Sequence, residues 1–453
     1  MNIKVKEIIN LLDCKIKNIN IDDNEVIDQI STDTRNITKG SVFLALIGEK
    51  FDGHDFIEKA IDNGAKFIIS EIQVDYPCII VKNTKEAYLK IAEFYREKIN
   101  PIVIAVTGSV GKTTTKEFIS NVLKNKYNVL TTYKNFNNEI GVSKTILSLK
   151  ETDEVLVIEL GMDHAGEMRV LSKIVKPDYV ILTNIGLSHV GNFNSKDDIV
   201  KAKFEVFEYI KKDGLVIYNG DDETLNKNIH KVENKTFKFG YGKENDIITN
   251  SFISKGIYGT KIKVNILEKT YNFNTTAIGN HLGYSILPAV ILGELMDINS
   301  TEIIKEIESY KYADKRMALV KVNNFTVIND TYNASLESMK SAIDTLEDTP
   351  GDLKKIAFLS DILELGNMSK EIHEELGLYL KNKKINKVIF VGKEVKYSYL
   401  KLKEEKFPDL RYFNNKEELK KEFKELVEND SIILLKGSRG TRMEELIEYL
   451  KEL

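Results

Sequence analysis

Short apolar runs recur along the central part of the chain. Ile102–Val106, Val155–Ile158 and Tyr179–Leu182 are typical of strands buried on both faces of a parallel sheet. Because these strands alternate with helical patterns, we expect a mainly parallel sheet with helices on both faces. The segment Thr236–Thr276 differs, since its period-2 alternation of polar and apolar residues predicts an antiparallel hairpin insert.

Strands also alternate with helices on both sides of this central region. Towards the N-terminus, the pattern predicts strands at Val42–Leu46, Phe67–Ile69 and Cys78–Val81. It predicts helices at Phe56–Asn63 and Thr84–Lys98. Towards the C-terminus it predicts strands at Phe325–Ile328, Ile356–Leu359, Val388–Val391 and Ile432–Leu435, and helices at Ser338–Leu346, Lys370–Leu380 and Met443–Leu450. Asn100-Pro101 marks a boundary, and 453 residues are too many for one core. We expect three α/β domains at residues 1–99, 100–312 and 313–453.

Composition narrows the class of protein. Hydrophobic residues make up 42% and charged residues 30% of the chain, as in soluble globular proteins. The formal net charge of −4 gives no reason to expect nucleic acid or an anionic membrane as a partner. No apolar run approaches the roughly 20 residues that span a bilayer, and the N-terminus lacks the apolar core of a signal peptide. Two cysteines are too few for a disulfide framework, so we expect a cytoplasmic protein with reduced thiols.

The first central strand leads into a glycine-rich turn. The stretch Thr107–Thr114 reads TGSVGKTT and lies between the predicted strand and a helix start. Its glycines let backbone N–H groups close around an anion, to which the helix N-terminus adds its positive dipole. Lys112 can reach the β- and γ-phosphates, and the Thr113 hydroxyl can ligate Mg²⁺. An ordinary strand–helix turn is the alternative, but this placement of GKT favours a nucleotide-binding loop.

Polar residues follow the next two buried strands. Glu159 comes directly after the second strand, and Asn184 and His189 come after the third. Because ligands lie beyond the carboxyl ends of parallel strands, we expect these side chains to point towards the loop. A buried acid is costly unless it meets a cation, which favours Glu159 as a Mg²⁺ ligand over a helix cap or a salt-bridged acid. His189 is equally compatible with a metal ligand and with a structural histidine.

Lys203 lies within the apolar face of a predicted helix. Over Asp197–Lys212, apolar residues recur at helical spacing, and at about 100° per residue Lys203 falls among them. The lysine could extend its amine to solvent or pair with a buried acid. It could also act at a metal or substrate site, either as an ammonium or, after carbamylation, as a carboxylate-like Mg²⁺ ligand. The sequence leaves these alternatives open.

Together these residues resemble the Mur ligase family, whose members use ATP to join an amino acid or peptide to a cell-wall precursor. The resemblance extends over essentially the whole chain. In the central region it rests on the loop, Asn135–Gly141, Glu159–Gly161, Thr183–Ile185 and Lys203, which falls on the lysine that the family carbamylates. In the N-terminal third, Ser31–Arg35, Phe43–Leu46 and Phe51–His54 resemble the family's uridine-diphosphate domain.

The last third indicates the branch of the family. Asn329–Ala334, Leu359–Gly366 with His373, and Lys436–Arg439 resemble members that add D-alanyl-D-alanine (D-Ala-D-Ala) to UDP-N-acetylmuramoyl-tripeptide (UDP-MurNAc-tripeptide). The DNPR signature of diaminopimelate-adding members is absent. The resemblance implies a ligase that uses ATP and Mg²⁺, forms an acyl phosphate and has a Rossmann-like C-terminal domain. We expect a monomer without nucleic acid or stable membrane association.

The resemblance also assigns roles to individual residues. Implied ATP contacts are Thr107, Gly108, Ser109, Val110, Gly111, Lys112, Thr113, Thr114, Asn280, Arg316 and Asn333. Implied metal ligands are Thr113, Glu159, His189 and carbamylated Lys203; the last three form the implied catalytic set together with Lys112. Implied contacts to the uridine-diphosphate substrate are Ser31, Thr32, Asp33, Thr34, Arg35, Gly53 and His54.

The chain departs from the family pattern at three places. Ser143 and Leu336 stand where the family often has proline, which we interpret as backbone adjustments. In Gly279–Ser285, which reads GNHLGYS, both later asparagines of the family's adenine-side motif are replaced, so the adenine contacts stay unassigned. The alternative functions are another ligase of this fold, such as an amino-acid-adding member, a phosphate-loop ATPase without ligation, or a homologue that has lost activity.

Overall fold

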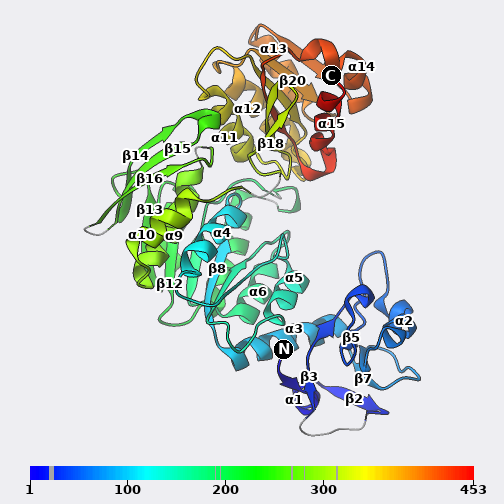
Figure 1. Ribbon diagram of the computed structural model, residues 1–453. Helices are drawn as coiled ribbons and strands as arrows, with labels where there is room; N and C mark the ends of the chain where they lie inside the picture. Colours follow the sequence, from blue (N-terminus) through cyan, green and yellow to red (C-terminus); the bar gives the residue numbers. More distant parts are fainter. Residues whose placement is uncertain (20–24, 189, 194, 267–268, 280, 313–314) are drawn as a thin grey trace. The chain divides into compact units, whose positions relative to one another are not determined.

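The chain folds into three larger α/β sheets with their helices (Figure 1). The computed structural model describes residues 1–19, 25–188, 190–193, 195–266, 269–279, 281–312 and 315–453. The chain divides into two compact units. The first unit contains Met1–Val106, Lys126–Val180 and Ala202–Gly214. The second unit contains Thr107–Asn125, Ile181–Lys201 and Leu215–Leu453. Within the described ranges, no helix combines the length and the apolar character that crossing a membrane requires. The predicted α/β class is confirmed.

The N-terminal sheet has five strands in the order β2-β7-β6-β5-β4. Their bounds are Cys14–Lys17 (β2), Ile30–Ser31 (β4), Val42–Leu44 (β5), Phe67–Ser70 (β6) and Cys78–Val81 (β7). All neighbours are parallel except β2, which is antiparallel to β7 at one edge. The predicted helices are present as α2 (Ile57–Asp62) and α3 (Thr84–Ile99). A short strand pair, β1 (Ile3–Lys4) with β3 (Val26–Ile27), and helix α1 (Val5–Leu11) complete this region.

Helix α3 is anchored through a buried arginine. Arg96 is 3% exposed, and its Nε and Nη2 donate to the carbonyl oxygens of Val175 and Lys176, each at 2.7 Å. These carbonyls close the C-terminal end of α6 (Glu167–Val175), where Lys176 takes a left-handed conformation with φ 44°. The guanidinium therefore satisfies helix-terminal carbonyls that have no partner within their own helix.

Replacing Arg96 with alanine is expected to destabilise the first unit. The substitution leaves one buried and one partly buried carbonyl without their donor, which lowers the free energy of unfolding by about 2 kcal/mol. For a unit of this size, that corresponds to a fall of about 4–8 °C in the melting temperature, measurable by calorimetry. Arg169→Ala is the matched control, because the Arg169 side chain is 53% exposed. Equal melting shifts in the two variants would contradict this role of Arg96.

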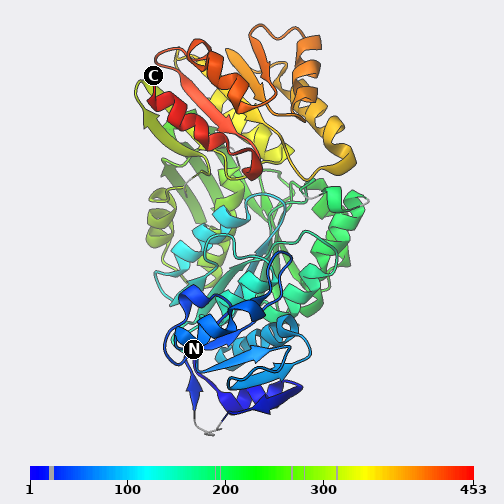
Figure 2. The same cartoon turned by 90° about the vertical axis from the view of Figure 1, so that its right-hand side faces the viewer.

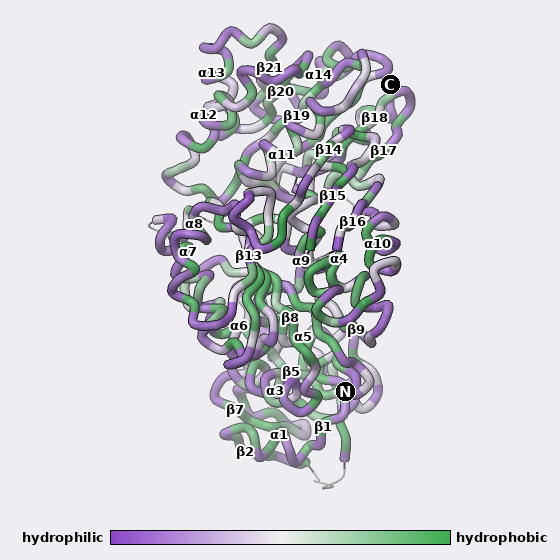
Figure 3. Tube along the Cα trace, turned by 90° about the vertical axis from the view of Figure 1, so that its left-hand side faces the viewer, coloured by the Kyte–Doolittle hydropathy of each residue, from purple (hydrophilic) through white to green (hydrophobic). Residues whose placement is uncertain are grey.

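The central sheet has nine strands in the order β16-β15-β14-β13-β12-β11-β8-β10-β9. The strands are β8 (Ile102–Thr107), β9 (Val129–Thr131), β10 (Val155–Glu159), β11 (Tyr179–Leu182), β12 (Leu215–Asn219), β13 (Lys235–Gly240), β14 (Ile247–Ser254), β15 (Thr260–Ile266) and β16 (Lys269–Thr275). The helices are α4 (Lys112–Leu123), α5 (Glu139–Ile146), α6, α7 (Lys196–Phe204), α8 (Glu223–Asn228), α9 (Leu282–Leu295) and α10 (Ser300–Glu308). Hydrophobic residues gather along β8 (Figure 3), as expected of a strand with neighbours on both sides.

Two predictions in the central region are wrong in part. β13 pairs in parallel with β12 and β14, so only β14, β15 and β16 are antiparallel, and they extend the main sheet instead of forming a separate insert. The helix predicted over Asp197–Lys212 ends at Phe204 and continues as a 3₁₀ turn over Glu205–Tyr209. Alternation of polar and apolar residues indicates that one face of a strand is exposed. It does not indicate whether the strand runs parallel or antiparallel to its neighbours.

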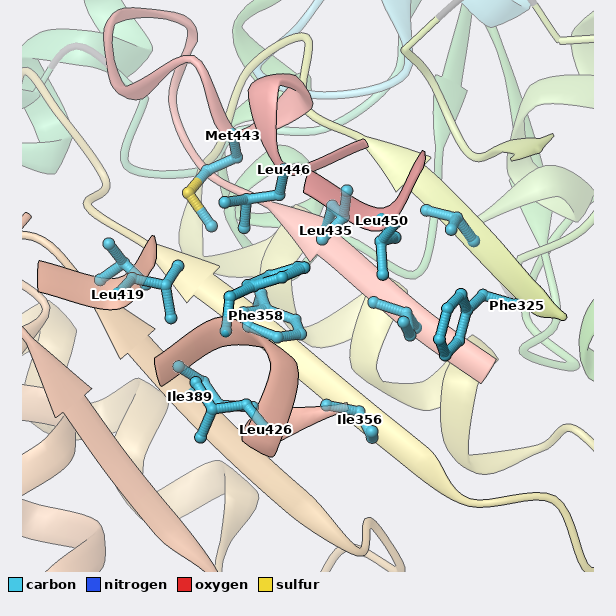
Figure 4. Close-up of a cluster of buried hydrophobic side chains, with 14 of the residues drawn as sticks. Phe325, Ile356, Phe358, Ile389, Leu419, Leu426, Leu435, Met443, Leu446 and Leu450 are labelled. Atoms are coloured by element: carbon cyan, nitrogen blue, oxygen red, sulfur yellow. The ribbon is translucent and has the colours of Figure 1, made fainter. Parts of the chain in front are cut away.

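The C-terminal sheet has six strands in the order β17-β18-β22-β19-β20-β21. Their bounds are Ala318–Val322 (β17), Phe325–Asp330 (β18), Lys355–Ser360 (β19), Lys387–Val391 (β20), Leu410–Phe413 (β21) and Ile432–Lys436 (β22), and only β17 is antiparallel to its neighbour. The helices are α11 (Leu336–Glu347), α12 (Ser369–Leu380), α13 (Lys396–Glu404), α14 (Lys416–Leu426) and α15 (Leu446–Lys451). The helix predicted at Met443–Leu450 begins as a 3₁₀ turn. Phe358 and Ile389 from the strands pack with Leu446 and Leu450 of α15 (Figure 4), and α15 lies along the sheet (Figure 2).

Candidate nucleotide site and its flanking residues

The turn after β8 has the geometry of an anion cradle. Gly108 has φ 143°, and a Cβ there would lie 2.0 Å from Thr183 Oγ1, so only glycine fits. Gly111 has φ 85° and directly precedes α4, whose first turn leaves backbone N–H groups without partners in the helix. Thr113 and Thr114 are buried at this helix start. A phosphate fits such a helix N-terminus electrostatically as well as sterically.

The end of β11 supports the loop through Asn184. Its Oδ1 accepts from the N–H of Val110 at 2.9 Å and from the N–H of Ser109 at 3.2 Å. The hydroxyl of Thr183 donates to the carbonyl of Val110 at 2.7 Å. Asn184 therefore lies against the loop, as the sequence predicted, and it fixes the loop backbone directly.

Lys112 lies back over the loop that precedes it. Its Nζ donates to the carbonyl of Gly108 at 2.8 Å and to that of Ser109 at 3.2 Å. The ammonium is thereby held close to the cradle, where it adds positive charge to the field of the helix N-terminus. The contact between Lys112 and phosphate stays a prediction.

Glu159 ends β10 as a buried carboxylate. It is 3% exposed, and in the parallel register it lies opposite Val106, one residue before the loop begins. Its Oε1 accepts from Asn137 Nδ2 at 2.8 Å, and its N–H donates to Thr132 Oγ1 at 2.9 Å. The sequence indicated Asn137 only as part of a motif. Its contact, from the loop between β9 and α5 to the end of β10, shows that it orients this carboxylate. One oriented carboxylate fits Mg²⁺, which takes one or two carboxylates together with phosphate oxygens and water.

Lys203 is buried, as its helical position predicted. It is 4% exposed, and Ile199, Ala202 and Val206 around it are also buried. His189, the fourth implied metal ligand, lies outside the described residues, as does Asn280. Across the residues that the structure describes, no cluster of three or more His, Cys, Asp and Glu side chains is found. The implied ligand set includes a threonine and a modified lysine, which such a cluster would not contain.

Arg316 and Asn333 lie at the start of the C-terminal region. The Arg316 guanidinium stacks on the ring of Tyr332, 3.7 Å from its centroid. Asn333 is exposed, and its carbonyl accepts from Lys436 Nζ at 3.1 Å, while the same ammonium pairs with Asp330 at 2.5 Å.

The residues predicted to bind the uridine-diphosphate substrate lie at the carboxyl ends of the strands in the five-stranded sheet. Ser31 ends β4 and pairs in register with Phe43 of β5, so Ser31–Arg35 and the loop after β5 lie at the same edge. Asp33 pairs with Arg35 at 2.8 Å, and this hydrogen-bonded ion pair lowers the pKa of Asp33. His54 Nε2 accepts from the N–H of Glu71 at 3.0 Å, and its Nδ1 meets Asp52 at 2.5 Å, so the ring shapes the loop.

Three family models match the chain in succession. They are described as "Mur ligase family, catalytic domain" (residues 26–107), "Mur ligase middle domain" (residues 106–293) and "Mur ligase, glutamate ligase domain" (residues 315–439). The UDP-N-acetylmuramoyl-tripeptide–D-alanyl-D-alanine ligase of Bacillus subtilis (strain 168) is 34% identical over 434 residues, covering 94% of both chains. The enzyme of the same name from Escherichia coli (strain K12) is 30% identical over 432 residues, covering 94% of both chains.

Solved structures are similar over nearly the whole chain. A crystal structure of MurF from Acinetobacter baumannii has a TM-score of 0.91 at 28% identity and covers 100% of this chain and 99% of its own. The MurF ligase from Thermotoga maritima, solved in complex with ADP, has a TM-score of 0.84 at 28% identity, with coverages of 94% and 97%.

Proposed function

The chain belongs to the Mur ligase family, and from this premise we propose that it ligates D-Ala-D-Ala to UDP-MurNAc-tripeptide and converts ATP to ADP and phosphate. The reaction belongs to the synthesis of peptidoglycan precursors. The observation that carries the proposal is the full-length similarity to ligases whose names state these two substrates. The geometry of the phosphate loop, over which Lys112 lies, supports the use of ATP.

The reaction joins a carboxylate to an amine in two steps. The γ-phosphoryl group of ATP transfers to the terminal carboxylate of the tripeptide, which gives an acyl phosphate and ADP. The free amine of D-Ala-D-Ala then attacks the acyl carbon, an amide bond forms, inorganic phosphate leaves and the amine loses a proton. The chemistry needs positioning and charge neutralisation more than it needs a protein nucleophile.

The loop and the implied metal ligands divide these tasks. The loop N–H groups and Lys112 bind the β- and γ-phosphates and counter their charge. We assign Thr113, Glu159, His189 and carbamylated Lys203 to Mg²⁺, which when bound neutralises phosphate and carboxylate oxygens. The carbamate forms when the neutral amine of Lys203 adds CO₂ and loses a proton. Asn137 holds Glu159 in one orientation for this purpose.

The other predicted residues receive roles by region. We assign Ser31–Arg35, Gly53 and His54 to the uridine-diphosphate part of the substrate, and Arg316, Asn333 and Asn280 to ATP. The domain boundaries at 99 and 312, a monomeric state and a cytoplasmic location are part of the same proposal. Two free cysteines among the described residues, together with ATP as a substrate, support that location.

Phosphate release from ATP tests the proposed function. We expect release to require both UDP-MurNAc-tripeptide and D-Ala-D-Ala, and the product to contain the new amide bond by mass spectrometry. Release that is indifferent to the dipeptide would contradict ligation and leave a phosphate-loop ATPase. Release that depends on UDP-MurNAc-dipeptide and a free amino acid instead would identify an amino-acid-adding ligase.

A further inference from the structure

The start of helix α9 lies beside the phosphate loop. A Cβ at Gly111 would come within 3.6 Å of Ser285 Oγ, which lies in the first turn of α9. Helices α4 and α9 also pack along each other. Leu282 and Ser285 stand here where the family pattern has asparagines, so another interaction has to fix this helix start.

Asp221, just after β12, is the centre of a hydrogen-bond cluster. Its Oδ2 accepts from Tyr284 Oη at 3.0 Å and from the N–H of Tyr241 at 2.6 Å. Its Oδ1 accepts from Asn245 Nδ2 at 2.8 Å and from the N–H of Gly242 at 3.0 Å. Burial raises the pKa of Asp221, but these four donors outweigh it and hold that pKa below its usual value. The carboxylate is charged and fully used as an acceptor.

Two tyrosines and a glycine fit together around this carboxylate. The rings of Tyr241 and Tyr284 meet edge to face with centroids 4.8 Å apart. A Cβ at Gly283 would lie 1.9 Å from the Tyr241 hydroxyl, so the glycine is needed for the ring to sit there. The hydrogen bond from Tyr284 to Asp221 therefore fixes the start of α9, and the ring of Tyr241 packs beside Tyr284.

A second carboxylate connects this cluster to the loop. Asp222 follows Asp221 in the chain, and its Oδ2 accepts from the N–H of Ile185 at 2.8 Å. Ile185 follows Asn184, whose side chain accepts from the loop N–H groups of Ser109 and Val110. An unbroken series of hydrogen bonds and peptide links thus runs from the Tyr284 hydroxyl to the phosphate-binding backbone.

We propose that Tyr284 is a positioning residue for ATP, which holds the phosphate loop in its binding conformation through Asp221, Asp222 and Asn184. This inference rests on the proposed use of ATP. It explains how the chain can replace the asparagines of Gly279–Ser285 and keep a fixed helix start beside the loop. Tyr284 itself acts through the carboxylates.

Tyr284→Phe tests this role, because it removes only the hydroxyl. We expect the KM for ATP and the dissociation constant of ADP to rise about five- to tenfold. This is part of the effect of losing one hydrogen bond to a charged group, because Tyr284 acts on ATP only through other residues. The kcat and the KM for D-Ala-D-Ala stay within about twofold. Tyr271→Phe is the matched control, since the buried Tyr271 hydroxyl bonds Glu294 and Ser300 at the other end of α9.

The outcomes separate this proposal from the proposed function. Unchanged ADP affinity in Tyr284→Phe, or equal losses in Tyr284→Phe and Tyr271→Phe, would overturn the positioning role. Asp222→Ala removes the acceptor of the Ile185 N–H, which breaks the same series at another point. It is expected to give the same selective loss, so the test survives if Tyr284→Phe folds poorly. Failure of the wild-type chain to bind ADP would instead overturn the use of ATP, and the positioning role with it.

Discussion

Replacing Lys112 with methionine is expected to lower the rate of ligation by about 10²–10³-fold, the usual effect of removing one preorganised group that stabilises developing charge. The Nζ lies 2.8 Å from the carbonyl of Gly108, so the ammonium is held at the phosphate cradle before ATP arrives. Methionine keeps the length of the side chain and removes the charge. The loss should appear in kcat at saturating ATP, because the charge on the transferring phosphoryl group is no longer countered.

Two neighbouring lysines sharpen this test. Lys124→Met is the control, since Lys124 is exposed at the far end of the same helix and should keep full activity. Lys116 is buried one turn after Lys112. If Lys112→Met retained more than about a tenth of the activity while Lys116→Met lost it, the phosphate charge would be countered from the second turn of α4, and the assignment of Lys112 would be wrong.

Much of the fold could be predicted because its central strands are buried on both faces. Continuous apolar runs such as Val155–Ile158 and Ile432–Leu435 identify such strands without any periodicity. The strands that escaped prediction include two short edge strands, β2 with the sequence CKIK and β21 with LRYF, and also the interior strand β12, which lies between β13 and β11. In the two edge strands every residue except Phe413 is at least partly exposed, so their sequences do not differ from those of loops.

The site was predictable where its residues are contiguous in the chain. The loop from Thr107 to Thr114 carries its own signal, because glycine, lysine and threonine occur at fixed offsets between a strand and a helix. The roles of Asn137 and Asn184 depend on contacts with segments that are distant in the sequence, and only coordinates show which groups these side chains contact. The Tyr284–Asp221 contact joins residues 63 positions apart and has no sequence pattern of its own.

Lys203 is the buried group whose chemistry the sequence left open. At 4% exposure, the Lys203 side chain lies among buried aliphatic side chains, so its amine does not extend to solvent. A neutral amine is the form that adds CO₂. Burial therefore supports carbamylation over an amine that extends to solvent, while pairing with an acid remains the competing role.

Lys203→Ala is accordingly expected to reduce ligation at least about 100-fold, because a carboxylate-like ligand for Mg²⁺ is lost. The alanine leaves space where the lysine was, so a short carboxylate such as acetate or formate should restore part of the activity. Lys201→Ala is the control, since Lys201 lies on the same helix with a side chain 76% exposed. Rescue by carboxylates, and loss of wild-type activity when bicarbonate and CO₂ are removed, would establish the carbamate. Full activity in Lys203→Ala would remove the lysine from the metal site, whereas a loss that no carboxylate restores would favour an ion pair that only stabilises the fold.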